Sequence, residues 1–307
     1  MTTQRITILL CTFNGAAHLD AQLRSYLAQT HQSWDLWVSD DGSTDDTDAI
    51  LERFRRDHST GRAIRILKGP QQGGTVNFLS LMCHPDLPPG PIALSDQDDV
   101  WMPEKLSRAL AAIAQAGDVV LYGAQSLHTD HALRVSGKSV PMPRPPSFGN
   151  ALVQNIVSGH SAVLSAGALQ LVRRAGVPSG VPYHDWWLYQ LIIAAGGAVV
   201  IDNAAVLYYR QHGANAIGAN RGFRACIGRI TMVIGRHYGV WLAANIAALT
   251  NAENLLSQSS QAVLADLRIH PRRFGIRRVL AFARGDLLRQ SWGATVLLYL
   301  AVLFGRA

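Results

Sequence analysis

The first 125 residues alternate between short β-rich apolar runs and segments with helical periodicity, and this alternation limits the fold more than any other feature. Strands that alternate with helices at this spacing form parallel sheets with right-handed crossovers, so we expect an α/β, doubly wound fold. The expected strands cover residues 6–11, 34–39, 63–67, 91–95 and 119–122, and the expected helices cover residues 16–28, 75–83 and 103–115, with another beginning at residues 43–46.

Three polar clusters directly follow expected strands: Thr12-Phe13-Asn14, Asp40-Asp41 and Asp96 to Asp99. In doubly wound sheets, ligands bind outside the carboxyl ends of the strands. We therefore expect these clusters to line one binding crevice.

The segment Asp40-Asp41-Gly42-Ser43 has two interpretations. Asp and Gly favour turns, and Ser43-Thr44-Asp45-Asp46 has the pattern of a capping box that begins a helix. A carboxylate at the tip of a strand can equally accept hydrogen bonds from the base or ribose of a nucleotide. The sequence leaves both interpretations open.

Asp96, Asp98 and Asp99 place three carboxylates within four residues, and the next basic residue is Lys105. Such a cluster is costly unless a cation neutralises it. Because Mg²⁺ binds one or two carboxylates together with substrate phosphates, a divalent-cation site is the favoured interpretation. A solvated acidic loop is the alternative.

Two later motifs also carry reactive side chains. In His184-Asp185-Trp186-Trp187 a carboxylate adjoins aromatic surface, which suits a general base, although a helix N-cap at Asp185 is the simpler interpretation. Arg210 is suited to bind a diphosphate and His212 to ligate a metal, with an ordinary surface loop as the alternative.

The second half of the chain has weaker patterns. Residues 136–149 contain four prolines and are expected to form a loop, whereas residues 221–304 are mostly helical in pattern. Further strands are expected at residues 158–165 and 198–209, and a helix at residues 183–195.

Basic charge is confined to the last part of the chain. Residues 221–307 contain 12 Arg and 3 acidic residues, a balance of +9, whereas residues 1–220 have a balance of −2. This contrast predicts two parts with different roles, a domain of residues 1–220 and a basic, mainly helical region of residues 221–307. Arginines mixed with apolar residues suit an anionic membrane surface, and packing on the protein or contact within a homo-oligomer is the alternative. Nucleic acid is disfavoured because this region has no Lys and its pattern shows no aromatic platform interleaved with the basic residues.

Location and redox state follow from composition. The three scattered cysteines suit a reducing cytosol, and neither a signal peptide nor a run of about 18 apolar residues is evident. We expect a cytoplasmic protein, peripheral on the inner face of the plasma membrane if the basic region binds lipid.

Together the motifs resemble bacterial glycosyltransferases of family two, close to the rhamnosyltransferases of cell-surface polysaccharide synthesis. The resemblance covers residues 5–220, and it implies the GT-A fold, a doubly wound mixed sheet with a C-terminal mainly helical region. It rests on the order and spacing of Thr12-Phe13-Asn14-Gly15, Asp40 to Asp45, Leu94 to Trp101, His184 to Trp187 and Arg210-Gln211-His212.

The resemblance also implies roles for single residues. Thr12, Asn14 and Asp41 would line the nucleotide pocket, with Asp96 near the ribose. Asp98 and His212 would hold Mg²⁺ or Mn²⁺, Arg210 would meet the diphosphate, and Asp185 would deprotonate the acceptor.

The implied reaction is an inverting, metal-dependent sugar transfer, with rhamnose favoured, from a dTDP- or UDP-linked donor to a saccharide or polyprenyl-linked acceptor. A nucleotidylyltransferase is one alternative, but residues 12–19 lack the basic, Gly-rich loop of that class. A catalytically inactive module that binds sugar nucleotides or lipid is the other, and the intact carboxylates of Asp96, Asp98 and Asp185 argue against it.

Overall fold

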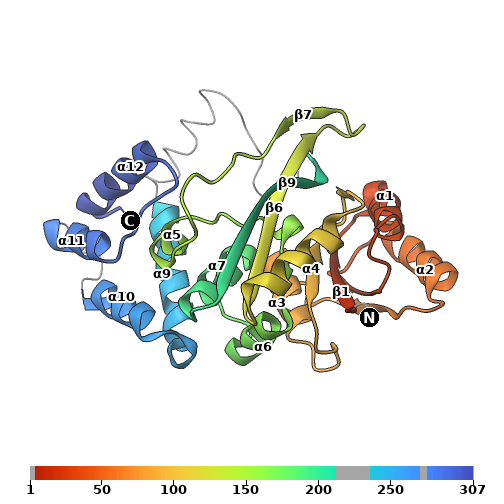
Figure 1. The fold of residues 1–307 in the computed structure, drawn as a ribbon, viewed down its shortest axis with the longest axis horizontal. Helices are drawn as coiled ribbons and strands as arrows, with labels where there is room; N and C mark the ends of the chain where they lie inside the picture. The colour runs from red at the N-terminus through yellow and green to blue at the C-terminus, as the bar shows by residue number, and fades with distance from the viewer. Residues whose placement is uncertain (1–3, 212–235, 270–274, 307) are drawn as a thin grey trace. The chain divides into compact units, whose positions relative to one another are not determined.

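The computed structural model describes residues 4–211, 236–269 and 275–306 (Figure 1). The chain divides into two compact units: residues 1–141, 157–177 and 197–217 form the first, and residues 142–156, 178–196 and 218–307 form the second. The domain boundary expected near residue 220 lies outside the described residues and stays a prediction.

The first unit begins with the expected alternation of strands and helices. Its elements are β1 (Ile6–Thr12), α1 (Ala16–Leu27), β2 (Trp34–Asp40), α2 (Thr47–His58), β3 (Ile64–Lys68), α3 (Gly74–Met82), β4 (Ile92–Ser95), β5 (Val100–Trp101), α4 (Lys105–Ala116), β6 (Val120–Thr129), β7 (Val135–Lys138), β8 (Val163–Leu164), α6 (Ala166–Ala175) and β9 (Ala198–Arg210).

These strands form one mixed sheet in the order β3-β2-β1-β4-β8-β6-β9-β5, with β7 paired to β6. β1 pairs in parallel with β2 and β4, and β2 pairs in parallel with β3, whereas β8 is antiparallel to both β4 and β6. In this register Thr12 lies opposite Asp40, and Leu10 lies opposite Ser95. The polar clusters that follow β1, β2 and β4 therefore meet at one edge of the sheet, and the predicted α/β fold is confirmed.

Alternate side chains of the strands enter one continuous core. Ile6, Ile8 and Leu10 of β1 are fully buried, and they belong to the same cluster as apolar side chains of α1, α2 and α4. This period of two is the pattern expected for a strand with a helix layer on that face. The core fixes the strands, and hence the loops at their carboxyl ends.

Three sequence expectations are wrong in detail. Ser43 does not cap α2: the helix begins at Thr47, and the Ser43 hydroxyl donates to Asp40 Oδ1 at 2.6 Å. The strand expected at residues 158–165 is reduced to β8, preceded by a 3-10 turn (Gly159–Ser161), and β8 separates β4 from β6. The loop expected at residues 136–149 contains the end of β7 and the start of α5 (Phe148–Val153).

The second unit is helical in the part of the chain that the structure describes. It contains α5, α7 (His184–Ala194), α9 (Arg236–Asn251), a 3-10 turn (Glu253–Leu255), α10 (Gln258–Ile269), α11 (Ile276–Arg284) and α12 (Trp292–Leu303). Tyr238 of α9 donates to the carbonyl of Val153 at 2.7 Å, and Ser257 N donates to the carbonyl of Ala194 at 2.9 Å. The mainly helical C-terminal region is thus confirmed, and none of the described helices has the length and apolarity needed to cross a bilayer.

Candidate active site

The acidic turn, Asp96 to Asp99, joins β4 to β5 at the edge where the parallel strands end. Gln97 fixes this turn, because Phe13 N donates to its Oε1 at 2.8 Å and its Nε2 donates to Phe13 O at 3.0 Å. Gly15 leaves room for that amide, since a Cβ at Gly15 would lie 2.3 Å from Gln97 Oε1. The acidic turn is therefore tied to the loop that follows β1.

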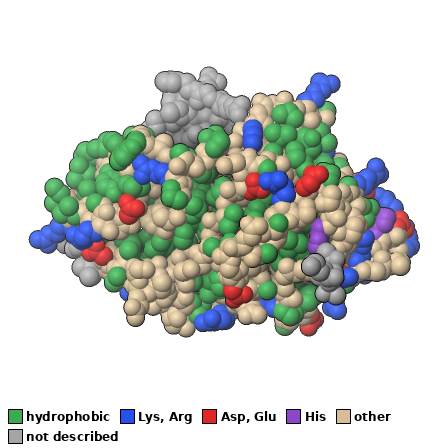
Figure 2. All heavy atoms as spheres, in the orientation of Figure 1, with side chains coloured by type: hydrophobic (Ala, Val, Ile, Leu, Met, Phe, Trp, Pro, Cys, Tyr) green, Lys and Arg blue, Asp and Glu red, His purple; other side chains and the backbone are tan. Residues whose placement is uncertain are grey.

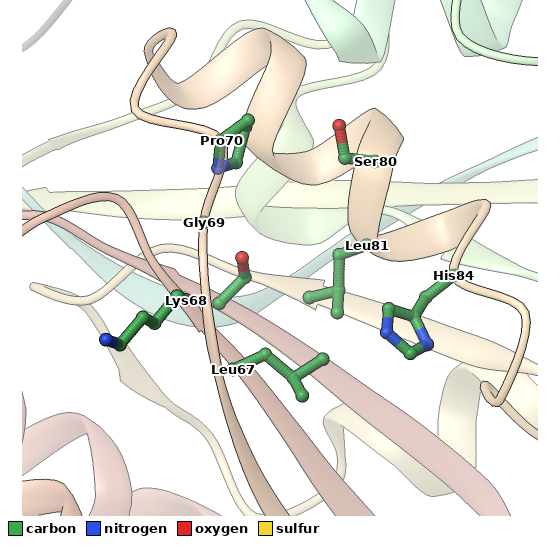
Figure 3. Close-up of a pocket in the computed structure, with 8 residues that line it drawn as sticks. Leu67, Lys68, Gly69, Pro70, Ser80, Leu81 and His84 are labelled. Atoms are coloured by element: carbon green, nitrogen blue, oxygen red, sulfur yellow. The ribbon is translucent and has the colours of Figure 1, made fainter.

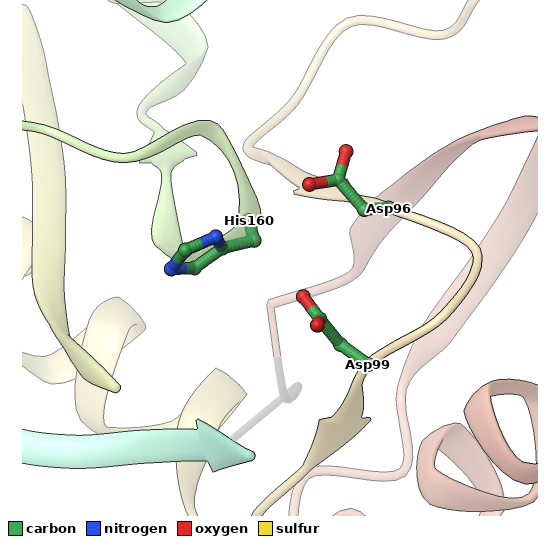
Figure 4. A group of neighbouring side chains, drawn as sticks. All are labelled: Asp96, Asp99 and His160. Carbon is green, nitrogen blue, oxygen red and sulfur yellow. The ribbon is translucent and has the colours of Figure 1, made fainter. Parts of the chain in front are cut away.

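Asp96, Asp99 and His160 each place a potential ligand atom within 4.8 Å of the others, and their side chains surround a common space (Figure 4). Asp96 is half-buried, whereas Asp99 and His160 are buried. His160 lies on the 3-10 turn that precedes β8, about 60 residues after the carboxylates. The fold thus adds an imidazole to the predicted acidic cluster.

The two carboxylate oxygens of Asp99 have different surroundings. Oδ1 accepts a hydrogen bond from Arg210 N at 3.3 Å, whereas Oδ2 is buried and accepts none from any residue that the structure describes. Burial raises the pKa of Asp99 well above its usual value, and the charges of Asp96 and Asp98 raise it further. Because a buried polar atom without a partner is costly, this oxygen is suited to bind a cation.

Lys105 is fully buried beside the acidic turn. Its Nζ lies 3.6 Å from the centre of the Trp101 ring and donates to the carbonyl of His160 at 2.5 Å. Burial lowers the pKa of Lys105 to about 7, although the charges of Asp99 and Asp96 oppose this. Lys105 thereby anchors the turn that carries His160 to the start of α4.

The His160 ring stacks on Tyr209, with ring centroids 4.6 Å apart and planes 28° apart. Burial lowers the pKa of His160 to about 3, and the charges of Lys105 and His128 lower it further. The ring is therefore neutral near pH 7, which is the form that ligates metals.

Carboxylates are ligands that suit Mg²⁺ and Mn²⁺, and a neutral imidazole is a common ligand of transition metals, so the three side chains together fit a divalent-cation site. The resemblance assigns the metal instead to Asp98 and His212. Asp98 lies half-buried in the same turn but outside the Asp96–Asp99–His160 grouping, and His212 lies outside the described residues. The assignment of Asp98 and His212 stays a prediction.

Thr12 and Asn14, both expected at the nucleotide, order the loops at the ends of β1 and β2. Thr12 Oγ1 donates to Asp40 Oδ1 at 2.7 Å. Asn14 has a φ of +48°, which Asn tolerates better than most residues, and its Oδ1 accepts from Thr44 N at 2.8 Å. Their predicted contact with a nucleotide is not tested by these bonds.

Asp41 organises the loop that follows β3. Its carboxylate accepts hydrogen bonds from Gln71 N at 2.7 Å and from Gly73 N at 2.8 Å, and the side chain is buried. Each oxygen retains a second lone pair, so a nucleotide contact through Asp41 stays a prediction.

A cavity of about 300 Å³ lies between β3 and α3, next to the Asp40-Asp41 turn (Figure 3). Gly69 joins the two features, because Gly69 N donates to the carbonyl of Asp40 at 2.6 Å. The described lining contains none of the predicted site residues and consists of Ser39, Leu67, Lys68, Gly69, Pro70, Ser80, Leu81 and His84.

Arg210 ends β9, and its backbone N donates to Asp99 Oδ1 at 3.3 Å. The guanidinium group donates through Nη1 to the carbonyl of His131, and the side chain is buried. The expected contact of Arg210 with a diphosphate stays a prediction.

Asp185 belongs to the second unit, in the first turn of α7. The N-cap expected at Asp185 is wrong, because the helix begins at His184 with Tyr183 as N-cap. Asp185 is half-buried, and its Oδ1 accepts from Trp186 N at 2.7 Å. Trp186 Nε1 donates to the carbonyl of Ala151 at 2.6 Å, which anchors this turn to α5.

The residue before Asp185 is His184. Burial lowers the pKa of His184, although the charge of Asp185 opposes this.

Sequence reasoning missed His160. It lies in residues 158–165, which were expected to form a plain strand. A single His far from the carboxylates in sequence gives no spacing signal, and only the pairing of β8 with β4 and β6 places it at the site.

A mixed sheet with carboxylates at the ends of its parallel strands is the arrangement of GT-A glycosyltransferases, and solved structures of this class share the fold. The mannosyltransferase PcManGT from Pyrobaculum calidifontis, in complex with GDP-Man and Mn²⁺, is 18% identical with a TM-score of 0.54, over 100% of this chain and 86% of that one. S. aureus TarS 1-349, in complex with UDP-GlcNAc, is 14% identical with a TM-score of 0.57, over 92% and 90%.

Glycosyl transferase family 2 matches residues 7–167, and the chain belongs to this family. The dTDP-rhamnosyl transferase RfbG of Shigella flexneri is 25% identical over 255 residues, covering 79% of this chain and 84% of its own. WfgD of Escherichia coli, a UDP-Glc:alpha-D-GlcNAc-diphosphoundecaprenol beta-1,3-glucosyltransferase, is 24% identical over 220 residues, covering 70% and 80%. The protein is therefore a glycosyltransferase.

Proposed function

We propose that this glycosyltransferase moves a sugar, with rhamnose favoured, from a nucleoside-diphosphate donor to a saccharide or lipid-linked acceptor, with inversion at the anomeric carbon and with Mg²⁺ or Mn²⁺ bound. The observation that carries the proposal is the Asp96–Asp99–His160 cluster, with its buried Asp99 oxygen, at the carboxyl edge of the parallel strands. Ligands of such sheets bind at this edge.

The name of RfbG supports dTDP-rhamnose as the donor, whereas the name of WfgD supports a UDP-hexose. The name of WfgD also supports an acceptor carried on undecaprenyl diphosphate. A lipid-linked acceptor would bring the enzyme to the cytoplasmic face of the plasma membrane.

In the proposed mechanism, Thr12, Asn14 and Asp41 orient the nucleotide, Asp96 lies near the ribose, and Arg210 meets the diphosphate. Asp96, Asp99 and His160 would hold the divalent cation, with Asp98 and His212 as the ligands that the family resemblance supplies. A bound cation supplies positive charge that stabilises the departing diphosphate. Asp185 accepts the proton of the acceptor hydroxyl as that oxygen attacks the anomeric carbon from the opposite face.

The role of Asp185 is tested with Asp185→Asn. We expect this variant to bind the donor as the wild type does, and to transfer sugar about 10²–10⁴ times more slowly, because the amide cannot accept the proton. Asp48→Asn makes the same change in the first turn of α2 and should leave transfer unaltered. Donors are first selected by thermal shift with Mn²⁺ over a panel of nucleotide sugars, and transfer is then followed by nucleotide release. Full turnover by Asp185→Asn would remove Asp185 from this role.

A further inference from the structure

Helix α12 is apolar on two opposite sides. Its inner side buries Thr295, Leu298, Ala301 and Val302. Its outer side exposes Trp292, Val296, Leu300 and Leu303 by 70%, 54%, 45% and 38%. These outer residues are spaced four, four and three positions apart and thus share one helix face, which surface helices of globular proteins normally make polar.

Helix α11 adds to this surface. Ile276 and Leu280, one turn apart, are exposed, whereas Ala281 and Phe282 are buried. Phe282 contacts Tyr299 of α12 edge to face, with ring centroids 6.3 Å apart, so the two helices pack together. Figure 2 shows hydrophobic side chains gathered over α11 and α12. We call Ile276, Leu280, Trp292, Val296, Leu300 and Leu303 the α11–α12 surface.

Arginines accompany the apolar residues. Residues 276–306 contain five Arg and one acidic residue, Asp286, and Arg284 is paired with Asp266 of α10 at 2.9 Å. Arg277 is exposed beside Ile276, and the Arg144 guanidinium lies 4.8 Å from the centre of the Trp292 ring. A Trp with a basic neighbour at the rim of an apolar helix face is the arrangement of helices that lie in a membrane interface.

The charge of this region indicates whether a second copy of the chain or a lipid bilayer covers the α11–α12 surface. Single exposed apolar residues need no explanation, but a continuous apolar face marks an interaction site. A second copy of the chain would bring the same arginines towards each other, whereas anionic lipid headgroups would neutralise them. Helix α12 has 12 residues, about 18 Å, and is too short to span a bilayer but long enough to lie along its surface.

We propose that the α11–α12 surface docks on an anionic lipid bilayer, with the outer face of α12 in the interface and the arginines at the headgroups. This proposal deepens the proposed function, and it rests on that function only for the lipid-linked acceptor, since docking would bring the enzyme to the membrane that holds such an acceptor.

Co-sedimentation of the full chain with vesicles tests this proposal. Phosphatidylcholine vesicles with about a third phosphatidylglycerol should bind the protein, and pure phosphatidylcholine vesicles or high salt should weaken binding at least about tenfold. The double variant Trp292→Gln, Leu300→Gln should lose at least about tenfold in partitioning, and Arg277→Glu should lose severalfold. The matched controls Val177→Gln and Arg56→Glu change exposed residues of the first unit and should bind as the wild type does.

Several results would overturn the proposal: no binding of the wild type to anionic vesicles, equal binding of the double variant, or a dimer in gel filtration that the double variant dissociates. Thermal shift with nucleotide sugars, run on every variant, separates this proposal from the proposed function. Retained donor binding with lost vesicle binding supports docking. A wild type that binds vesicles but no nucleotide sugar would refute the proposed function and leave docking standing.

Discussion

Gly69 occupies a point where no side chain fits. A Cβ there would lie 2.8 Å from Asp41 Oδ1, 2.8 Å from Asn77 Oδ1 and 2.9 Å from the backbone carbonyl oxygen of Asp40. These groups hold the turn after β2 against α3, and Asn77 also donates to the carbonyl of Ser39 at 2.9 Å. The turn that carries the predicted site carboxylate Asp41 therefore depends on the absence of a side chain at Gly69.

The variant Gly69→Ala should lower the melting temperature by about 5 °C, because the backbone of Asp40 must shift to relieve the contact. Gly74→Ala is the matched control, since a Cβ at Gly74 meets nothing within 4 Å and Ala is the better helix former at the start of α3. Thermal unfolding followed by circular dichroism measures both variants. Equal melting temperatures for the two would show that the packing around Gly69 is looser than the structure implies.

Among single residues, the sequence pattern predicted the carboxylates of the candidate site but not the histidine and lysine that lie beside them. The density of Asp96, Asp98 and Asp99 predicts a cation without knowledge of the fold, because like charges need neutralising. His160 could not be predicted, since its position depends on a strand of two residues, β8. Lys105 was visible only as the next basic residue, and its burial against Trp101 follows from the packing of α4.

At the scale of elements, one polar contact joins α4, β6 and β9. Asp202 of β9 accepts hydrogen bonds from Arg108 Nε at 2.9 Å and Nη2 at 3.0 Å, and from Tyr122 Oη at 2.9 Å. Burial alone would raise the pKa of Asp202, but hydrogen bonds from Ala204 N, Tyr122 and Arg108 hold it below its usual value. The ionised carboxylate therefore stabilises the folded state.

Because the folded pKa of Asp202 lies below the unfolded value of about 3.9, this stabilisation is complete above that pH and is lost as pH falls through the folded pKa. Asp202→Asn should lower the free energy of unfolding by about 1–2 kcal/mol at pH 7, and the difference from wild type should shrink below about pH 4. Urea unfolding of both proteins between pH 7 and pH 3 measures this difference in the free energy of unfolding. Asp20→Asn breaks the half-exposed pair with Arg53 and should have little effect at any pH. A wild-type-minus-variant difference that stays constant with pH would contradict the assignment.

Periodicity predicted the elements well where one helix follows one strand. β1 to β4 and α1 to α4 occur in the expected order because each expresses a local apolar pattern. The predicted start of α2 was wrong because the Ser43 hydroxyl donates to Asp40, and the capping pattern in the sequence does not reveal this hydrogen bond. Insertion of β8 between β4 and β6 is a long-range pairing that no local pattern encodes.

At the scale of the whole molecule, the chain passes between its two units more than once. Residues 142–156 and 178–196 group with the C-terminal helices, although the charge distribution predicted a single domain boundary near residue 220. The reason is physical: α5 and α7 both consist largely of buried residues, Trp186 of α7 donates to the carbonyl of Ala151 in α5, and Tyr238 of α9 donates to the carbonyl of Val153. Charge asymmetry reports surface composition rather than such packing.

We propose that Asp96, Asp99 and His160 hold a divalent cation that binds the donor diphosphate. The most direct test of this proposal is calorimetric titration of dTDP, and in parallel UDP, into the wild type, His160→Gln and the control His84→Gln, each with Mn²⁺ and with chelator. We predict that Mn²⁺ tightens nucleotide binding at least about tenfold in the wild type and in His84→Gln, and that His160→Gln loses most of this gain. Equal nucleotide affinity with and without chelator in the wild type, or a full Mn²⁺ gain in His160→Gln, would contradict the account.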